Sequence, residues 1–324
     1  MQELPIARDA ALLSTSGDEL SPRGAPAPDP ARLNELVRRR WDRLDWAAVI
    51  PPDALVIPEL HYMDVAALGL SEAQRVALNR LFACFTCELF VHFEAYVIRY
   101  LERVSASVQG VSRPGIERFI AEERVHSEAF RRLLHKLRPD LYADDPSEAL
   151  PLRFLRWSRG DDTALRLAPM GTFFLLAWLF EEITLFVPRA LDGCPQQCVP
   201  LVSEVMRLHA REEQPHVALD ERVLVHLTRS SRSFRSGLQT LLALPMLVYV
   251  DSKVRGAWRH LVASAARELA LTPAQHARIR DRGPTQSDRW GLQSFLGKLA
   301  PSGIAGARFL CWVLQRELRE PRSA

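Results

Sequence analysis

Three histidines and several glutamates stand at spacings that suit the binding of a metal ion. His209, Glu213 and His216 form an H-x-x-x-E-x-x-H string, and Glu123 and His126 form an E-x-x-H motif upstream. Spacings of three, four and seven residues place side chains on one face of a helix, where they can converge on an ion. The two strings therefore predict two metal-binding stretches of helix.

Two more acids extend this set of candidate ligands. Glu88 and Glu182 each lie in a long apolar run, where a buried carboxylate is costly unless it is paired or bound to a metal. Ferritin-like di-metal carboxylate proteins combine one glutamate from each of two helices with an E-x-x-H motif from each of the other two. This sequence has the same order along the chain. The predicted metal ligands are Glu88, Glu123, His126, Glu182, His209, Glu213 and His216.

Three of the chosen acids each directly follow another glutamate in the chain. These preceding glutamates are Glu122, Glu181 and Glu212. A step of one residue turns a side chain by about 100° around a helix, so only one acid of each pair faces a given core. The i to i+3 relation to a histidine favours Glu123 and Glu213. Glu182 is preferred to Glu181 on the apolar pattern alone, and Glu181 remains the alternative.

Helical periodicity predicts the elements that must position these ligands. Ser71 and Gln74 fit a capping box at the start of the first long helix. The long helices are expected at residues 71–104, 114–137, 168–191 and 199–228, with others near 31–45, 233–248, 251–270, 273–281 and 303–319. The only β-like run is residues 247–250. We expect an all-α protein, with a ferritin-like four-helix bundle core that carries a dinuclear metal site and with additional N- and C-terminal helices.

The chain divides into a short arm and one large domain. Residues 1–30 are rich in Pro, Ser, Ala and Gly and predict a mobile N-terminal arm. Residues 31–324 are expected to form a single helical domain, with the metal-binding bundle at about residues 70–230. Aromatic residues flank both Glu88 and Glu182 in the sequence. Core packing explains most of these aromatics, and a subset is expected to line a dry pocket.

Composition and charge narrow the class of protein. The 42 basic and 39 acidic residues are mixed along the chain and give a net charge of +3, so neither a nucleic-acid stripe nor a polybasic membrane anchor is expected. No window approaches 18 uninterrupted apolar residues, and the N-terminus lacks a secretory pattern. Five cysteines without a dense framework indicate reduced thiols, with Cys84 and Cys87 read as small buried residues. We expect a cytoplasmic protein.

The ligand types favour iron. Carboxylates can bridge two metal ions and imidazole adds a neutral nitrogen, a set that suits two iron ions and also admits manganese. No cysteine occupies a ligand position, which argues against a structural zinc or an iron–sulfur site. No catalytic residue beyond the metal centre is expected, with dioxygen as co-substrate.

His209 narrows the family, because it adds a third histidine on the face of Glu213 and His216. Over about residues 70–230 the sequence resembles the diiron arylamine N-oxygenases, the family of p-aminobenzoate N-oxygenase. The resemblance implies a diiron centre that uses dioxygen to oxidise an amine to a hydroxylamine, then to a nitroso or nitro compound, in secondary metabolism. Pro215 departs from the expected ligand string, and we expect a kink or a local bulge there.

Several functional alternatives stay open. The sequence has no dinucleotide fingerprint and no iron–sulfur cysteine set, so electrons are expected from a reductase or a ferredoxin. The amine is an aryl amine or an amino-acid-derived amine, and a homodimer is a reasonable assembly. A diiron carbon hydroxylase acting on a free or carrier-tethered substrate is the first alternative. A non-catalytic, ferritin-like iron-binding protein is the second.

Overall fold

The computed structural model describes residues 30–58, 68–105, 108, 113–142, 152–195, 198–230, 242–281, 286–302, 310–311 and 314–315. The predicted N-terminal arm and most of the predicted helix at 303–319 lie outside these ranges. The described helices are α2 (Pro30–Trp41), α3 (Glu72–Val104), α4 (Arg113–Leu137), α5 (Arg159–Leu167), α6 (Met170–Thr184), α7 (Val187–Asp192), α8 (Pro200–Ser230), α10 (Ala243–Glu268), α11 (Pro273–Arg280) and α12 (Gln286–Leu299). No strand occurs in the described part, which confirms the all-α class.

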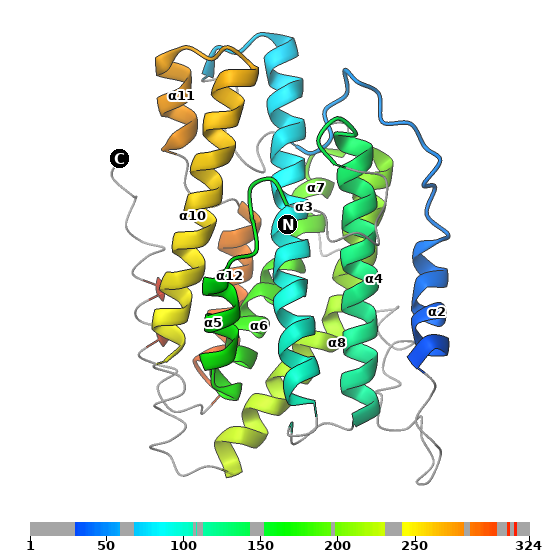
Figure 1. The fold of residues 1–324 in the computed structure, drawn as a ribbon, viewed down its shortest axis with the longest axis vertical. Helices are drawn as coiled ribbons and strands as arrows, with labels where there is room; N and C mark the ends of the chain where they lie inside the picture. Colours follow the sequence, from blue (N-terminus) through cyan, green and yellow to red (C-terminus); the bar gives the residue numbers. More distant parts are fainter. Residues whose placement is uncertain are drawn as a thin grey trace.

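Four helices surround the centre of the molecule. α3 packs along α4, α6 packs along α8, and α4 contacts α8. Stacked rings join α3 to α6: Phe93 lies on Phe180 with centroids 4.3 Å apart, and Tyr100 lies on Phe173 with centroids 3.7 Å apart. α2 covers the outer side of α4, α10 lies beside α3 and α6, and α12 packs on α6 and α7 (Figure 1). This arrangement leaves the inner faces of α3, α4, α6 and α8 turned toward one another.

Most long helices begin and end near the predicted residues. The capping box at the start of α3 is confirmed: the Gln74 N–H donates to Ser71 Oγ at 3.3 Å and the Ser71 N–H donates to Gln74 Oε1 at 2.9 Å. The helix predicted at 168–191 is instead two helices, α6 and α7, with Pro188 in the first turn of α7. Proline suits a first turn because its missing N–H has no intrahelical partner there.

The last third of the described chain differs more from the prediction. α10 runs unbroken from Ala243 to Glu268 and absorbs the β-like run at 247–250, so that local signal was misleading. α5 and α12 were not predicted. Both helices are short, and packing against longer helices can stabilise a short helix whose own sequence signal is weak.

Two apolar clusters form the core, and charged residues separate them. Along α8, Leu208 belongs to the first cluster and Val217 to the second; along α3, Val91 belongs to the first and Val97 to the second. His209, His216 and Glu94 lie between these positions in the chain. The bundle therefore has a polar layer between two hydrophobic ones.

Two apolar stretches, Glu72–Val104 and Met170–Asp192, are long and apolar enough to cross a membrane by length and composition. In each stretch 72% of an apolar 18-residue part is buried inside the protein. Core packing accounts for this composition, because both stretches lie at the centre of the bundle.

Glu88 fastens a loop to α3. One carboxylate oxygen accepts hydrogen bonds from Tyr142 Oη and the Arg153 N–H, both at 2.6 Å. The other oxygen accepts from the N–H groups of Phe154 at 2.7 Å and Leu155 at 2.9 Å. Burial raises the pKa of Glu88, while these donors lower it, and the net direction is upward. Three of the four hydrogen bonds thus hold the segment that leads into α5, and the fourth holds Tyr142, which follows α4.

We predict that Glu88→Gln lowers the free energy of unfolding by about 2–4 kcal/mol, because the amide NH₂ would face two donors and leave them unsatisfied. Tyr142→Phe, which removes one of the four bonds, should cost about 1 kcal/mol. Chemical denaturation monitored by circular dichroism measures both values. A Glu88→Gln protein as stable as wild type would contradict this role.

Candidate metal centre

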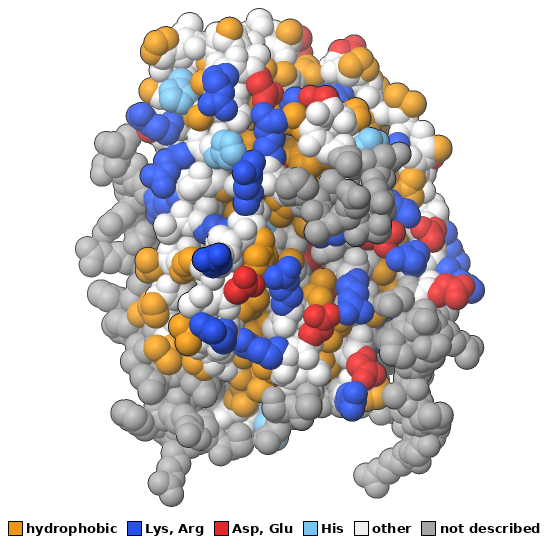
Figure 2. Space-filling model, viewed as in Figure 1, with side chains coloured by type: hydrophobic (Ala, Val, Ile, Leu, Met, Phe, Trp, Pro, Cys, Tyr) orange, Lys and Arg blue, Asp and Glu red, His pale blue; other side chains and the backbone are white. Residues whose placement is uncertain are grey.

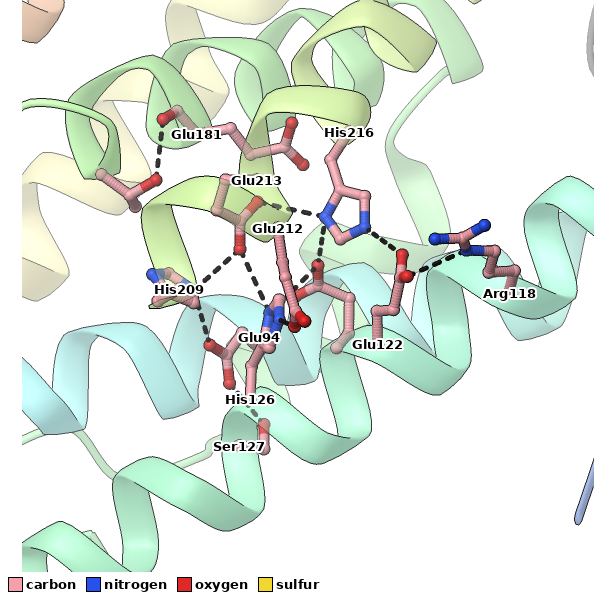
Figure 3. Close-up of polar contacts among 12 residues, drawn as sticks. Glu94, Arg118, Glu122, His126, Ser127, Glu181, His209, Glu212, Glu213 and His216 are labelled. Atoms are coloured by element: carbon pink, nitrogen blue, oxygen red, sulfur yellow. Dashed lines mark hydrogen bonds and ion pairs between the residues drawn. The ribbon is translucent and has the colours of Figure 1, made fainter. Parts of the chain in front are cut away.

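Six buried side chains from three helices converge in the polar layer. They are Glu94 from α3, Glu123 and His126 from α4, and His209, Glu213 and His216 from α8, each at most 2% exposed (Figure 3). They form two groups of three: Glu94 with His126 and His209, and Glu123 with Glu213 and His216. Within each group the potential ligand atoms lie within 4.8 Å of one another. This spacing suits one metal ion in each group.

Glu213 stands between the two groups. Its Oε1 lies 2.7 Å from His209 Nε2 and 3.2 Å from His126 Nδ1, whereas its Oε2 lies 3.1 Å from His216 Nδ1. Glu123 also faces both groups, with Oε1 2.9 Å from His216 Nδ1 and 3.8 Å from His126 Nδ1. Carboxylates whose oxygens face two positions are suited to bridge two metal ions.

The donor atoms that face inward lack ordinary hydrogen bonds. Glu94 Oε1, Glu123 Oε1, His126 Nδ1 and His209 Nε2 are buried and make no hydrogen bond of good geometry. A buried polar atom without a partner costs about 1–3 kcal/mol, and a coordinated cation would remove that cost. Oxygen and imidazole donors fit iron or manganese. The residues present therefore fit a pair of such ions.

The outward-facing atoms of the same ligands are held by other side chains. His126 Nε2 lies 3.0 Å from Glu212 Oε2, and His216 Nε2 lies 2.9 Å from Glu122 Oε2. Ser127 Oγ donates to Glu94 Oε2 at 2.7 Å. Partners of this kind fix the ring orientation and the tautomer of a metal-binding histidine.

The two supporting carboxylates have their own partners. Trp41 Nε1 of α2 donates to Glu212 Oε2 at 2.9 Å, and Arg40 reaches Glu212 Oε1 at 3.2 Å. Arg118 Nε donates to Glu122 Oε1 at 2.9 Å. Neither Glu122 nor Glu212 was among the predicted functional residues. The signal that could have found their role is the E-E-x-x-H string, which occurs once in α4 and, with Pro215 inside it, once in α8.

Glu181 supplies the contribution of α6. It is 2% exposed, and it is paired with Asp220 of α8, which is fully buried. Burial and the charge of Asp220 raise the pKa of Glu181, to which the charge of Glu213 adds. Burial likewise raises the pKa of Asp220. Acids buried side by side are harder to ionise together, and Figure 3 shows Glu181 next to Glu213.

Two of the seven predicted ligands lie elsewhere. Glu88 faces the loop at 153–155, and Glu182 pairs with Lys298 of α12 and accepts from Ser294 Oγ at 2.9 Å. Glu94 takes the place of Glu88 in the cluster, and Glu181 lies beside the cluster, where the charge of Glu213 acts on its carboxyl group. Glu94 is the sixth residue after Glu88, which puts the two on different faces of α3 at about 100° per residue. The other five predicted residues, Glu123, His126, His209, Glu213 and His216, are brought together as expected.

Pro215 does not displace its neighbours from the cluster. α8 runs as an α-helix from Pro200 to Ser230 with Pro215 inside it, and no bulge is assigned there. His216 lies in the cluster, 2.9 Å from Glu123. A proline in a helix interior costs about 3 kcal/mol in ordinary cases. The contacts of Glu213 and His216 on either side of Pro215 help to offset that cost.

Charges within the cluster set its protonation. Burial lowers the pKa of His126, but a hydrogen bond to Glu212 and the close carboxylates of Glu213 and Glu123 outweigh it and hold the pKa well above its ordinary value. Burial likewise opposes the raised pKa of His216, which the charge of Glu213 and a hydrogen bond to Glu122 produce. Burial and the charge of Glu213 raise the pKa of Glu123 to about 7. Without a metal, these imidazoles therefore keep their protons to a higher pH than histidines of ordinary pKa do.

No family model, no curated protein and no solved structure matches this chain. Any function proposed for the protein therefore rests on the residues of the cluster and their geometry.

We predict that Glu94→Ala and Glu181→Ala each lower the iron bound per chain after anaerobic loading with Fe(II). Glu182→Ala, one residue further along α6, should bind as much iron as wild type, because Glu182 faces Lys298. Elemental analysis of the desalted proteins measures the stoichiometry. Full iron in Glu94→Ala together with loss of iron in Glu182→Ala would favour the ligand set predicted from sequence.

We predict that the metal-free protein loses stability as the pH rises above about 6.5, the ordinary histidine pKa. In that range the folded state holds protons on His126 and His216 that the unfolded chain has released, so unfolding becomes easier with rising pH. This stabilisation is fully present below that pH. The lowered pKa of Glu122, about 2, makes the stability depend on pH only below the ordinary value of 4.5, where its contribution is lost as the pH falls. Thermal unfolding measured at about pH 6 and about pH 8 tests the direction.

The affinity for metal should change in the opposite direction over the same pH range. A metal ion needs deprotonated imidazoles, so its affinity should rise with pH and binding should release protons. Calorimetric titration with Mn(II) in two buffers of different ionisation enthalpy measures the protons released. Binding without proton release would contradict the protonation described for this cluster.

Proposed function

We propose that this protein is a non-haem diiron oxygenase that oxidises an amine nitrogen with dioxygen, in the biosynthesis of a secondary metabolite. The observation that carries the proposal is the position of His209. Its Nε2 lies 2.7 Å from Glu213 and 3.4 Å from Glu94, so a third imidazole joins the two E-x-x-H pairs in one buried cluster. A third histidine in this position is the feature by which the sequence resembles the diiron arylamine N-oxygenases.

A ferritin-like bundle core is part of this proposal. Its support is that α3 and α6 each contribute a single acid, while α4 and α8 each contribute an E-x-x-H pair. This is the distribution of ligands in ferritin-like di-metal proteins. In the proposed site, Glu94, His126 and His209 would hold one iron, and Glu123, Glu213 and His216 would hold the other. Manganese would fit the same donors.

A bound pair of iron ions would supply the activation of dioxygen, which carboxylates and imidazoles do not provide themselves. The residues of the chain position and shield that centre. Glu122 and Glu212 orient His216 and His126 through their outer nitrogens. The apolar clusters above and below the polar layer exclude water, which strengthens the electrostatic interactions inside it.

The reaction needs electrons from outside the protein. Conversion of R–NH₂ to R–NHOH inserts one oxygen atom of O₂, releases the other as water, and consumes two electrons and two protons. Cys84 and Cys87 are fully buried thiols whose pKa burial raises, so they are not reactive donors. We therefore propose a reductase or a ferredoxin as partner. Burial raises the pKa of both Glu181 and Asp220 beside the cluster.

The test is turnover with an aromatic amine. Protein loaded with about two irons per chain, supplied with a chemical reductant and ¹⁸O₂, should yield a product that carries labelled oxygen on nitrogen. His209→Ala should lower the rate by at least about tenfold, the scale seen when a residue that supports a metal site is removed. His226→Ala, on the same helix and outside the cluster, is the matched control and should retain the rate of wild type.

Each other outcome identifies a different protein. Labelled oxygen on carbon would replace the N-oxygenase proposal with a carbon hydroxylase. Many irons per chain in a large assembly, without turnover of any amine, would indicate iron storage. Failure to bind iron would overturn the diiron assignment itself.

A further inference from the structure

A second feature of the molecule is an apolar cavity on the other side of α3 and α6. It lies between these helices and α10 and is partly open to solvent. Its walls include Leu89 and Phe93 from α3, Phe173 and Phe180 from α6, and Met246 and Val250 from α10. No residue of the metal cluster lines it. The cavity is therefore a separate space from the proposed metal centre.

Helical spacing explains how one pair of helices can serve two sites. The lining residues of α3 include positions 89, 92, 93 and 96, and those of α6 include positions 173, 176, 177 and 180. Within each helix these spacings place the side chains on one face. Glu94 and Glu181 follow Phe93 and Phe180 in the chain and turn about 100° away. The stacked rings of Phe93 and Phe180 thus stand close to the acids of the polar layer while they line the cavity.

One end of the cavity is polar but carries no unbalanced charge. Lys253, which lines the cavity, pairs with the fully buried carboxylate of Asp161. Asp161 also accepts hydrogen bonds from Tyr96 and from Tyr249, the second at 3.0 Å, and from the Ser158 N–H at 2.6 Å. Its negative charge is therefore satisfied within the protein. A charged ligand would find no free counter-charge among these groups.

His92 is the polar group that remains available at this end. It lines the cavity and is only 7% exposed, and neither of its ring nitrogens makes a hydrogen bond within the described part of the chain. Nε2 lies 3.6 Å from Asp161 Oδ1, beyond a good hydrogen bond. Buried imidazoles ordinarily have a partner. A ligand in the cavity would provide one.

We propose that this cavity binds an uncharged aromatic molecule that carries one hydrogen-bonding group, which His92 meets. The rings of Phe93, Phe173 and Phe180 offer stacking surfaces to an aromatic body. The apolar walls exclude a charged group, because burying an unpaired charge is strongly unfavourable. Binding in this cavity does not require a metal. That the bound molecule is also the one oxidised is a further step, which rests on the proposed function.

Figure 2 shows one face of the molecule, on which basic, acidic and apolar side chains are interspersed. Among the side chains coloured there, acidic groups lie between the basic ones, which weakens any field that would draw a charged ligand toward the protein. This mixed surface agrees with selection by the apolar cavity itself.

Two fluorescent probes that share one skeleton test the charge selectivity. N-phenyl-1-naphthylamine is neutral and carries one N–H group, and 1-anilinonaphthalene-8-sulfonate adds a sulfonate. The neutral probe should bind with a stoichiometry of one per chain, at least about tenfold more tightly than the sulfonate. Equal affinity for the two probes, or no binding of the neutral one, would overturn the proposal.

Two tryptophan substitutions on α10 test the location. Val250 lines the cavity and is half-buried, whereas Val248, two residues away, is 68% exposed. Val250→Trp should fill part of the cavity and lower the affinity for the neutral probe by at least about tenfold, while Val248→Trp should bind as wild type. Loss of binding in both variants, or in neither, would overturn the assignment of the probe to this cavity.

His92→Leu tests the hydrogen bond and should weaken binding of the neutral probe by about threefold to tenfold, the effect of one hydrogen bond. Circular dichroism confirms that each variant is folded. All titrations are run on metal-free and iron-loaded wild-type protein, and equal binding is expected in both. If binding follows this pattern and no amine is oxidised, the cavity stands and the N-oxygenase proposal fails. The reverse result leaves the oxygenase and removes this cavity as a binding site.

Discussion

The cost of burying charge at the centre of a helical bundle is the constraint on which this structure depends. Glu94, Glu123, Glu213 and three histidines are removed from water between two apolar clusters. An isolated buried carboxylate or imidazolium is strongly unfavourable, so each must meet an opposite charge, a hydrogen-bond donor or a metal. The surrounding helices must therefore pack so that all of these side chains are brought together, because the polar layer forms only as a complete set.

The way α4 and α8 meet shows how that requirement is fulfilled. Each helix carries an E-E-x-x-H string. In each string the second glutamate faces the cluster, and the first supports the histidine of the other helix: Glu122 holds His216, and Glu212 holds His126. A rotation or a shift of one helix would break both supports at once. The reciprocal pairing therefore fixes the position of the two helices as well as the orientation of the imidazoles.

Elements outside the four central helices complete two different environments. α2 covers one side, where Trp41 and Arg40 bind the carboxylate of Glu212. α10 covers the other side, where Lys253 binds Asp161 at the end of the apolar cavity. Each flanking helix thus neutralises a buried acid of the adjoining region. The same two helices, α3 and α6, turn one face to the charged layer and another to the apolar cavity, which makes them the wall between the two.

The sequence by itself determined the helical class, most long helices, and five members of the cluster. It could do so because side chains three and four residues apart share a helical face whatever lies around the helix. It did not determine which acids α3 and α6 contribute. Glu88, Glu94, Glu181 and Glu182 all stand in apolar runs, and the choice depends on which face meets the other helices. Only the tertiary structure decided this, by turning Glu88 to the loop at 153–155 and Glu182 to Lys298.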